Sequence, residues 1–203
     1  MAAKFLPYLL AGISVGGQYA LIAIGYTMVY GILRLINFAH GDVIMVGAYV
    51  CFFAMTGLSP MFEAGSMAAA VVPALAGVVL SMAVCTVLGV VIEGLAYKPL
   101  RQAPSLAVLI TAIGVSYFLQ NSALILWSSS PKIFSPIVGS GSQKSGPLTI
   151  SHVTLVTIAA CVVIMLGLTA FTGKSKMGKA MRACSEDRGA AQLMGINVNA
   201  TIA

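Results

Sequence analysis

Charged residues are scarce in this sequence. Asp, Glu, Lys and Arg make up 8% of the 203 residues, and hydrophobic residues make up 59%. An ordinary soluble domain has about 25% charged residues. A chain with 8% cannot cover a water-exposed surface with charged side chains. The mean hydropathy of +0.99 agrees with this composition. We therefore exclude a soluble enzyme, a nucleic-acid-binding protein and a disordered tail, and expect most of the exterior to face lipid.

Metal-binding and nucleotide-binding patterns are also missing. The four cysteines form no CxxC pair and no Cys/His ligand spacing, so neither a metal site nor a disulfide is predicted. Residues 173–180 approach the G-x-x-x-x-G-K-[ST] phosphate loop, but Ala180 stands where the magnesium-binding hydroxyl belongs. We expect no cofactor, no metal and no nucleotide site in this chain.

Long apolar runs make up most of the chain. A helix needs about 20 apolar residues to cross the hydrocarbon core of a bilayer, whereas strands of a membrane barrel alternate over about ten. The sequence therefore predicts an all-α, polytopic transmembrane helix bundle with about five spans in a single domain covering residues 1–203. The expected spans are residues 5–33, 43–58, 64–92, 106–127 and 152–171.

The basic residues predict the orientation of these spans, because short cytoplasmic loops are enriched in Lys and Arg. With the C-terminal tail in the cytoplasm, eight of the 11 basic residues are cytoplasmic and three are external. We therefore expect an external N-terminus. The external loop, residues 128–151, is rich in Ser, Gly and Pro and is expected to be irregular. The cytoplasmic residues would be Arg34, Lys98, Arg101, Lys174, Lys176, Lys179, Arg182 and Arg188; the external ones would be Lys4, Lys132 and Lys144.

Polar residues interrupt the apolar sequence between the first two runs, in Asn37-Phe-Ala-His40-Gly-Asp42. Asp42 suits an N-cap, since its carboxylate would meet the amides and the positive dipole of the next helix. The segment then forms a capped cytoplasmic turn. Alternatively, it is a broken helix that lines a substrate pathway, as in many transporters. A metal site at His40 and Asp42 is the third interpretation.

Polar residues also lie inside or at the end of later runs. Gln120 and Asn121 lie within the fourth run, where a buried amide needs a partner. They either bond a neighbouring helix or line the pathway. Glu93 ends the third run, where it is expected to reach the interface and pair with Lys98 or Arg101.

The tail after the last run has helical patterns of its own. Met177, Ala180, Met181 and Cys184 form an apolar stripe among basic residues. Ser185 then suits the N-cap of a second helix, with two acids in its first turn and Gly195 at its end. An amphipathic helix on anionic lipid is one interpretation of the tail. Docking into a protein groove is the other, and it fits the acids better.

Several of these segments resemble the branched-chain amino-acid permeases of ATP-binding-cassette importers, most closely the first of the two paired permeases. The similarity extends over most of the chain. The segments are Tyr19-Ala-Leu-Ile-Ala-Ile-Gly25, Ile36-Asn-Phe-Ala-His-Gly-Asp42, Glu93-Gly-Leu-Ala-Tyr-Lys-Pro-Leu-Arg101, Phe118-Leu-Gln-Asn121, Gly178-Lys-Ala-Met-Arg182-Ala-Cys-Ser-Glu186-Asp187 and Ala190-Ala-Gln-Leu-Met-Gly195-Ile-Asn197.

The resemblance implies a non-enzymatic subunit of the bacterial inner membrane that moves branched-chain amino acids by alternating access. Its implied partners are a second permease, two ATP-binding subunits, a periplasmic amino-acid-binding protein and membrane lipid. Residues 173–203 would be the cytoplasmic coupling segment. Such permeases continue with further membrane helices, so we expect this chain to be C-terminally truncated. The implied ATPase-coupling residues are Arg182, Glu186, Asp187, Ala190, Ala191 and Gly195.

Two other functions remain open at this point. A permease of the same fold could carry urea or short amides. A membrane-integral enzyme would need His40, Asp42 and Glu93 to converge; against it, no nucleophile–base pair or metal spacing is present.

Overall fold

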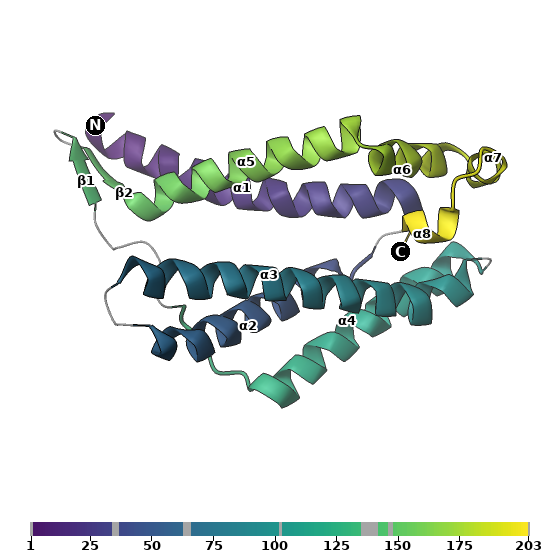
Figure 1. The fold of residues 1–203 in the computed structure, drawn as a ribbon, viewed down its shortest axis with the longest axis horizontal. Coiled ribbons are helices and arrows are strands. Elements are labelled where there is room, and N and C mark those ends of the chain that lie inside the picture. The colour runs from purple at the N-terminus through teal and green to yellow at the C-terminus, as the bar shows by residue number, and fades with distance from the viewer. Residues whose placement is uncertain are drawn as a thin grey trace. The chain divides into compact units, whose positions relative to one another are not determined.

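Five long helices dominate the computed structural model, which describes residues 2–33, 37–62, 66–101, 103–134, 142–145 and 148–202 (Figure 1). All five are long and apolar enough to cross a membrane, so the predicted all-α polytopic fold is confirmed. They are α1 (Ala2–Leu33), α2 (His40–Leu58), α3 (Met67–Ile92), α4 (Ser105–Trp127) and α5 (His152–Lys174).

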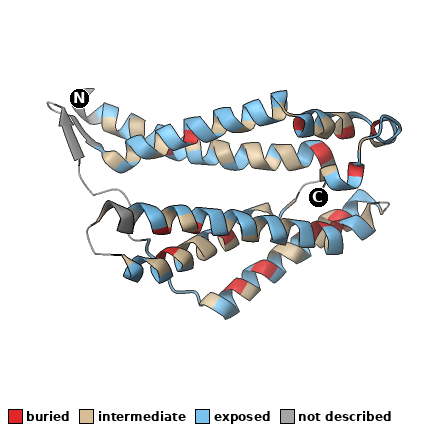
Figure 2. Cartoon of the chain, viewed as in Figure 1, coloured by how far each residue is buried: buried red, intermediate tan, exposed pale blue. Residues whose placement is uncertain are grey.

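Buried residues are few on these helices, as Figure 2 shows. Large apolar side chains are exposed all along them; Ile125 on α4, for example, is 85% exposed and Leu75 on α3 is 61% exposed. A soluble domain rarely exposes so much contiguous apolar surface. The helices therefore present to lipid, or to other membrane helices, the kind of surface that a soluble protein buries.

The chain divides into two compact units. Residues 1–34 and 138–202 form the first unit, in which α1 packs on α5. The contact is close at Gly17, where an added Cβ would lie 3.2 Å from the Cβ of Cys161. Small residues let membrane helices approach closely, because packing replaces the hydrophobic drive in lipid.

The second unit consists of residues 35–137, and its closest pair is α2 with α3. A Cβ at Gly47 would lie 2.7 Å from Sγ of Cys85 and 2.9 Å from Oγ of Ser81. Ser81 also donates a hydrogen bond to the carbonyl of Gly47 (2.9 Å). A Cβ at position 47 would therefore force the side chains of Cys85 and Ser81 to shift, so the α2–α3 contact favours glycine there.

A short β-hairpin precedes α5, in a segment predicted to be irregular. Strand β1 (Ser142–Ser145) pairs antiparallel with β2 (Leu148–Ser151). The pairing of these two strands was missed by the sequence prediction. The rest of the predicted loop is described as far as residue 134 and includes no helix or strand there.

Three short helices follow α5: α6 (Lys176–Glu186), α7 (Arg188–Leu193) and α8 (Val198–Ile202). They share a small apolar cluster of the buried residues Cys184, Ala191 and Val198. The tail is therefore a folded element of the first unit.

Candidate functional site

The break before α2 is built around Asn37. Its side-chain oxygen accepts hydrogen bonds from the backbone N–H of Ala39 (3.0 Å) and from the Tyr97 hydroxyl (2.7 Å). The backbone N–H of His40, the first residue of α2, donates to the carbonyl of Asn37 (3.2 Å). Asn37 therefore fixes the turn and ties it to the end of the third membrane segment.

Asp42 lies in the first turn of α2, but it does not cap this helix, which begins two residues earlier with Ala39 in the cap position and no side-chain cap bond. The N-cap prediction was therefore wrong. The Asp42 residue is 7% exposed. Its carboxylate accepts hydrogen bonds from the Ser116 hydroxyl and from Nε2 of Gln120 (3.0 Å), both on α4. Gln120 Nε2 also lies 3.1 Å from the Ser116 oxygen. We call Asp42, Ser116 and Gln120 the carboxylate cluster.

The carboxylate cluster joins the first turn of α2 to the middle of α4. Ser116 follows the first residue of α4, Ser105, by eleven positions, which at 1.5 Å per residue is about 16 Å. The hydrocarbon core is about 30 Å thick, so Ser116 lies about halfway along the α4 span, whereas Asp42 is the third residue of the α2 span. A carboxylate there is costly and, in membrane proteins, marks a functional site by default.

The other predicted pathway residues are not part of this cluster. Asn121 is exposed, and its Nδ2 donates to the carbonyl of Tyr117 in its own helix (2.7 Å). His40 begins α2 and is half-buried. The structure thus joins Asp42 with Gln120, ties Asn37 to Tyr97, and places Asn121 on another side of α4.

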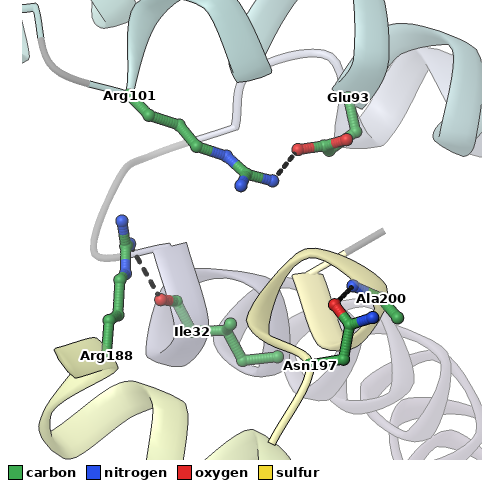
Figure 3. Close-up of polar contacts among 6 residues, drawn as sticks. All are labelled: Ile32, Glu93, Arg101, Arg188, Asn197 and Ala200. Carbon is green, nitrogen blue, oxygen red and sulfur yellow. Dashed lines mark hydrogen bonds and ion pairs between the residues drawn. The ribbon is translucent and has the colours of Figure 1, made fainter. Parts of the chain in front are cut away.

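Glu93 forms an ion pair with Arg101 (Figure 3). The pairing of Glu93 with a nearby base was predicted, and Arg101 is its partner. Glu93 opens a turn of π-helix, η2 (Glu93–Tyr97), which is followed by the 3₁₀ turn η3 (Lys98–Leu100). These turns bring the two charges together and end the third span. Glu93 is thus engaged by Arg101, whereas Asp42 is held by Ser116 and Gln120.

Helix α6 folds back onto the end of α5. Ser175 separates the two helices, and its hydroxyl accepts a hydrogen bond from the N–H of Gly178 (2.9 Å). A Cβ at Gly178 would overlap the backbone oxygen of Thr172, so this approach requires glycine. Nη2 of Arg182 donates to the carbonyl of Gly173 (3.2 Å). A cation at a helix C-terminus is favourable, because it meets the negative end of the helix dipole.

Helix α7 is capped by Asp187, not by Ser185. The Asp187 carboxylate accepts hydrogen bonds from the N–H groups of Gly189 (2.7 Å) and Ala190 (3.1 Å). The Ser185 hydroxyl instead donates to the carbonyl of Arg182 (2.8 Å), inside α6. The predicted helix from Ser185 was therefore too long, because α6 continues through Glu186.

Gly195 ends α7 as predicted, with a positive φ of 80°. The N–H of Gly195 donates to the carbonyl of Gln192, and the N–H of Ile196 donates to that of Ala191 (both 3.0 Å). This pair of bonds is a Schellman motif, which favours glycine at the left-handed position. Ile196 then packs on the cluster that contains Ala191.

Arg188 ties the start of α7 to the membrane helices. Its Nη2 donates to the carbonyl of Ile32, in the last turn of α1 (3.2 Å; Figure 3). Beyond α7, the side chain of Asn197 accepts from the N–H of Ala200 (3.1 Å) and so caps α8. Hydrogen bonds thus hold the tail to the last turn of α1, through Arg188, and to the last turn of α5, through Arg182.

The predicted coupling residues lie on different sides of this tail. Ala191 is 4% exposed and faces the tail cluster. Arg182, Glu186, Asp187, Ala190 and Gly195 are exposed. Leu193 (90% exposed) and Met194 (82% exposed) lie next to them at the end of α7. We call Ala190, Leu193, Met194 and Gly195 the α7 surface.

Two residues of the site were missed by the sequence prediction. Ser116 precedes Gln120 by four positions, which places both on one face of α4. That spacing was a usable signal. Tyr97 offered none, because a tyrosine near the end of an apolar run is common at membrane interfaces.

Five helices that are long and apolar enough to cross a membrane define a multi-pass membrane protein. The family described as branched-chain amino acid transport system, permease component, matches residues 8–203. This chain belongs to that family. No solved structure matches it significantly.

Three curated relatives are similar to the chain. The high-affinity branched-chain amino acid transport system permease protein BraD of Pseudomonas aeruginosa is 40% identical, covering 98% of this chain and 65% of its own length. LivH of Escherichia coli K12, which carries the same description, is 41% identical with the same coverage. A probable branched-chain permease of Methanocaldococcus jannaschii is 28% identical over 89% of this chain and 55% of its own. The chain thus spans about 65% of the length of BraD and LivH.

Proposed function

We propose that this chain is a permease subunit of an ATP-driven importer of branched-chain amino acids. Membership of this family, and the names of BraD and LivH as branched-chain amino acid permeases, support the substrate class. The observation that carries the proposal in the structure is the buried carboxylate of Asp42, which is bonded to Ser116 and Gln120 of α4. Transport would proceed by alternating access, with ATP hydrolysed by two separate subunits.

The substrate pathway is proposed to run past the break before α2. Irregular backbone at membrane depth is tolerated only where protein or a water-filled cavity lies beside it. Asp42 and Gln120 supply polar atoms at that level, and Asn37 holds the turn. His40 and Asn121 complete the proposed pathway set, with Asn121 on a surface that a second permease subunit would cover.

The tail is proposed to be the coupling segment, at residues 173–203. Its short helices are held to α1 and α5 by Arg188 and Arg182. A force applied to α7 is therefore transmitted to two spans of the same unit. The α7 surface is apolar and small, which suits a shallow groove on an ATP-binding subunit. Asp187 and Glu186 border it, and Ala191 supports it from below.

The proposed orientation places the N-terminus outside and the tail in the cytoplasm of a cell with an inner membrane. The distribution of basic residues supports it. The further partners are a second permease subunit and a periplasmic amino-acid-binding protein that delivers the substrate.

Uptake by the complete importer tests this function. The full-length permease that contains this chain is co-reconstituted with its partner subunits, and accumulation of labelled leucine, isoleucine and valine is followed with and without ATP. We expect ATP-dependent uptake of all three and none of urea or acetamide. Uptake of urea without leucine would contradict the proposed substrate class.

A further inference from the structure

A groove lies in the first unit, where α1, α5 and α6 meet. It has a volume of about 150 Å³. Its α1 wall consists of Thr27, Met28, Gly31 and Ile32, and its α6 wall includes Met181 and Arg182. Pockets for drug-sized ligands measure about 300–1,000 Å³. This groove is therefore too small for a drug-sized ligand, but its apolar lining suits part of a hydrocarbon chain.

The groove lies at the level where two spans end. The candidate span of α1 ends at Ile32 and that of α5 ends at Lys174. The apolar floor of the groove, formed by Met28, Ile32 and Met181, therefore lies at the boundary between the hydrocarbon and the headgroups.

Basic residues are concentrated at this boundary. Lys174, Lys176, Lys179 and Arg182 fall within nine positions, and no acidic residue lies among them. Arg182 lines the groove and is exposed. Its bond to the carbonyl of Gly173 holds the guanidinium beside the last turn of α5. The nearest acids in the sequence, Glu186 and Asp187, lie beyond this group, and Asp187 caps α7.

We propose that the groove binds one anionic phospholipid of the adjacent leaflet. Part of an acyl chain lies against Met28, Ile32 and Met181, and the lipid phosphate lies beside Arg182 and the neighbouring lysines. Basic sites at the ends of membrane helices bind anionic headgroups, with about 1 kcal/mol for each Lys or Arg near the surface. The four cations explain the preference for an anionic lipid over a zwitterionic one. Lipid binding would also give a function to the basic residues of segment 173–180, which resembles a phosphate loop but has Ala180 in place of the hydroxyl residue.

Two features of the groove make the proposal specific. Gly178 allows α6 to approach the end of α5, and a larger residue would overlap the Thr172 carbonyl. Gly31 lines the groove, and open space lies where its Cβ would project. Leucine at position 31 is therefore expected to occupy part of the groove, which provides a steric test.

The test uses the full-length permease in nanodiscs that contain phosphatidylethanolamine and phosphatidylglycerol in a 3:1 ratio. Native mass spectrometry after mild detergent release identifies the retained lipid. We expect the wild-type protein to retain one phosphatidylglycerol molecule. Gly31→Leu removes the retained lipid, and Arg182→Gln lowers its occupancy about fivefold, the factor for one lost cation at the surface. Arg182→Lys keeps the charge and retains the lipid.

Matched controls separate the groove from general effects on the fold. Gly12→Leu makes the same change on α1, at another glycine with open space around it. Lys132→Gln removes a cation from a different part of the chain. Both are expected to retain phosphatidylglycerol as the wild type does. Equal retention by Gly31→Leu and Gly12→Leu, or equal retention of both lipids by the wild type, would overturn the proposal. A cross-link from Thr27→Cys to another protein subunit, with no lipid retained by the assembled complex, would overturn it as well.

Discussion

Gln120 on α4 donates a hydrogen bond to the carboxylate of Asp42 on α2, with 3.0 Å between Nε2 and Oδ1. The two residues are 78 positions apart in the sequence, and Ser116 bonds the second carboxylate oxygen. This contact ties the broken start of α2 to the middle of a neighbouring span. It places a charge-bearing side chain where transport proteins handle polar substrates.

Replacement of Asp42 by Ala is expected to lower the stability of the permease by about 1–3 kcal/mol, because the Ser116 hydroxyl and the Gln120 amide lose a charged acceptor. Gln120→Leu is expected to cost less, and the double variant less than the sum. Thermal unfolding in detergent measures all three. Asn121→Leu is the matched control, because the Asn121 side chain donates to the Tyr117 carbonyl of its own helix.

Transport separates the structural role of Asp42 from the pathway role. Uptake is divided by the amount of assembled complex for each variant. If Asp42 lines the pathway, uptake per complex falls in Asp42→Ala and in Asp42→Asn. Unchanged uptake per complex in both variants would show that the cluster only holds the helices together.

Replacement of Gly47 by Ala is expected to destabilise the α2–α3 pair, because the new Cβ would meet Cys85 and Ser81 below 3.0 Å. Gly57 lies on the same helix with open space around it, and Gly57→Ala is expected to be neutral or stabilising by up to about 1 kcal/mol. Thermal unfolding of the two variants gives the comparison. Equal stability of both variants would contradict the close helix approach at Gly47.

Replacement of Asp187 by Ala is expected to cost about 0.5–2 kcal/mol of local stability, the usual effect of losing an N-cap. Asp187→Asn keeps a capping side chain and is expected to behave nearly as the wild type. The Gly189 and Ala190 amides donate to the Asp187 carboxylate. Their hydrogen exchange therefore reports the loss of the cap directly. Faster exchange in the Asn variant than in the Ala variant would contradict the assignment of the cap.

The proposed topology predicts which side of the membrane each loop faces. Single cysteines are introduced at Lys132 and at Lys176 after the four native cysteines are replaced by Ala or Ser. An impermeant thiol reagent added to intact cells is expected to label position 132 and not position 176. Labelling of position 176 alone would reverse the orientation.

The helices could be predicted from the sequence, because an apolar run of about 20 residues has few other stable states in a membrane. Their starts were nearly right: residue 106 was predicted for α4 and the helix begins at Ser105. The pairing of Asp42 with Gln120 could not be predicted. Ser116 and Gln120 mark one polar face of α4, but nothing in the sequence shows which neighbouring helix that face meets.

The helix boundaries in the tail were also only partly predictable from the sequence. Ser185 and Asp187 are both good N-cap residues, so the sequence alone did not decide where α7 begins. In the structure α6 continues to Glu186, and the Ser185 hydroxyl bonds the Arg182 carbonyl within α6. Ser185 therefore cannot cap α7. Gly195 was predictable, because a glycine after a short apolar helix has few other roles.

Cross-linking of α7 to an ATP-binding subunit tests the central claim most directly. Cysteine is placed at Leu193 (90% exposed) in a cysteine-free importer, with Ala191 (4% exposed) as the matched control on the same helix. Each variant is treated with a thiol-to-amine cross-linker in proteoliposomes, with and without ATP. The account predicts that Leu193→Cys cross-links to the ATP-binding subunit in a yield that changes with ATP, and that Ala191→Cys does not. The absence of any such cross-link from Leu193→Cys, in a complex that still imports leucine, would contradict the account.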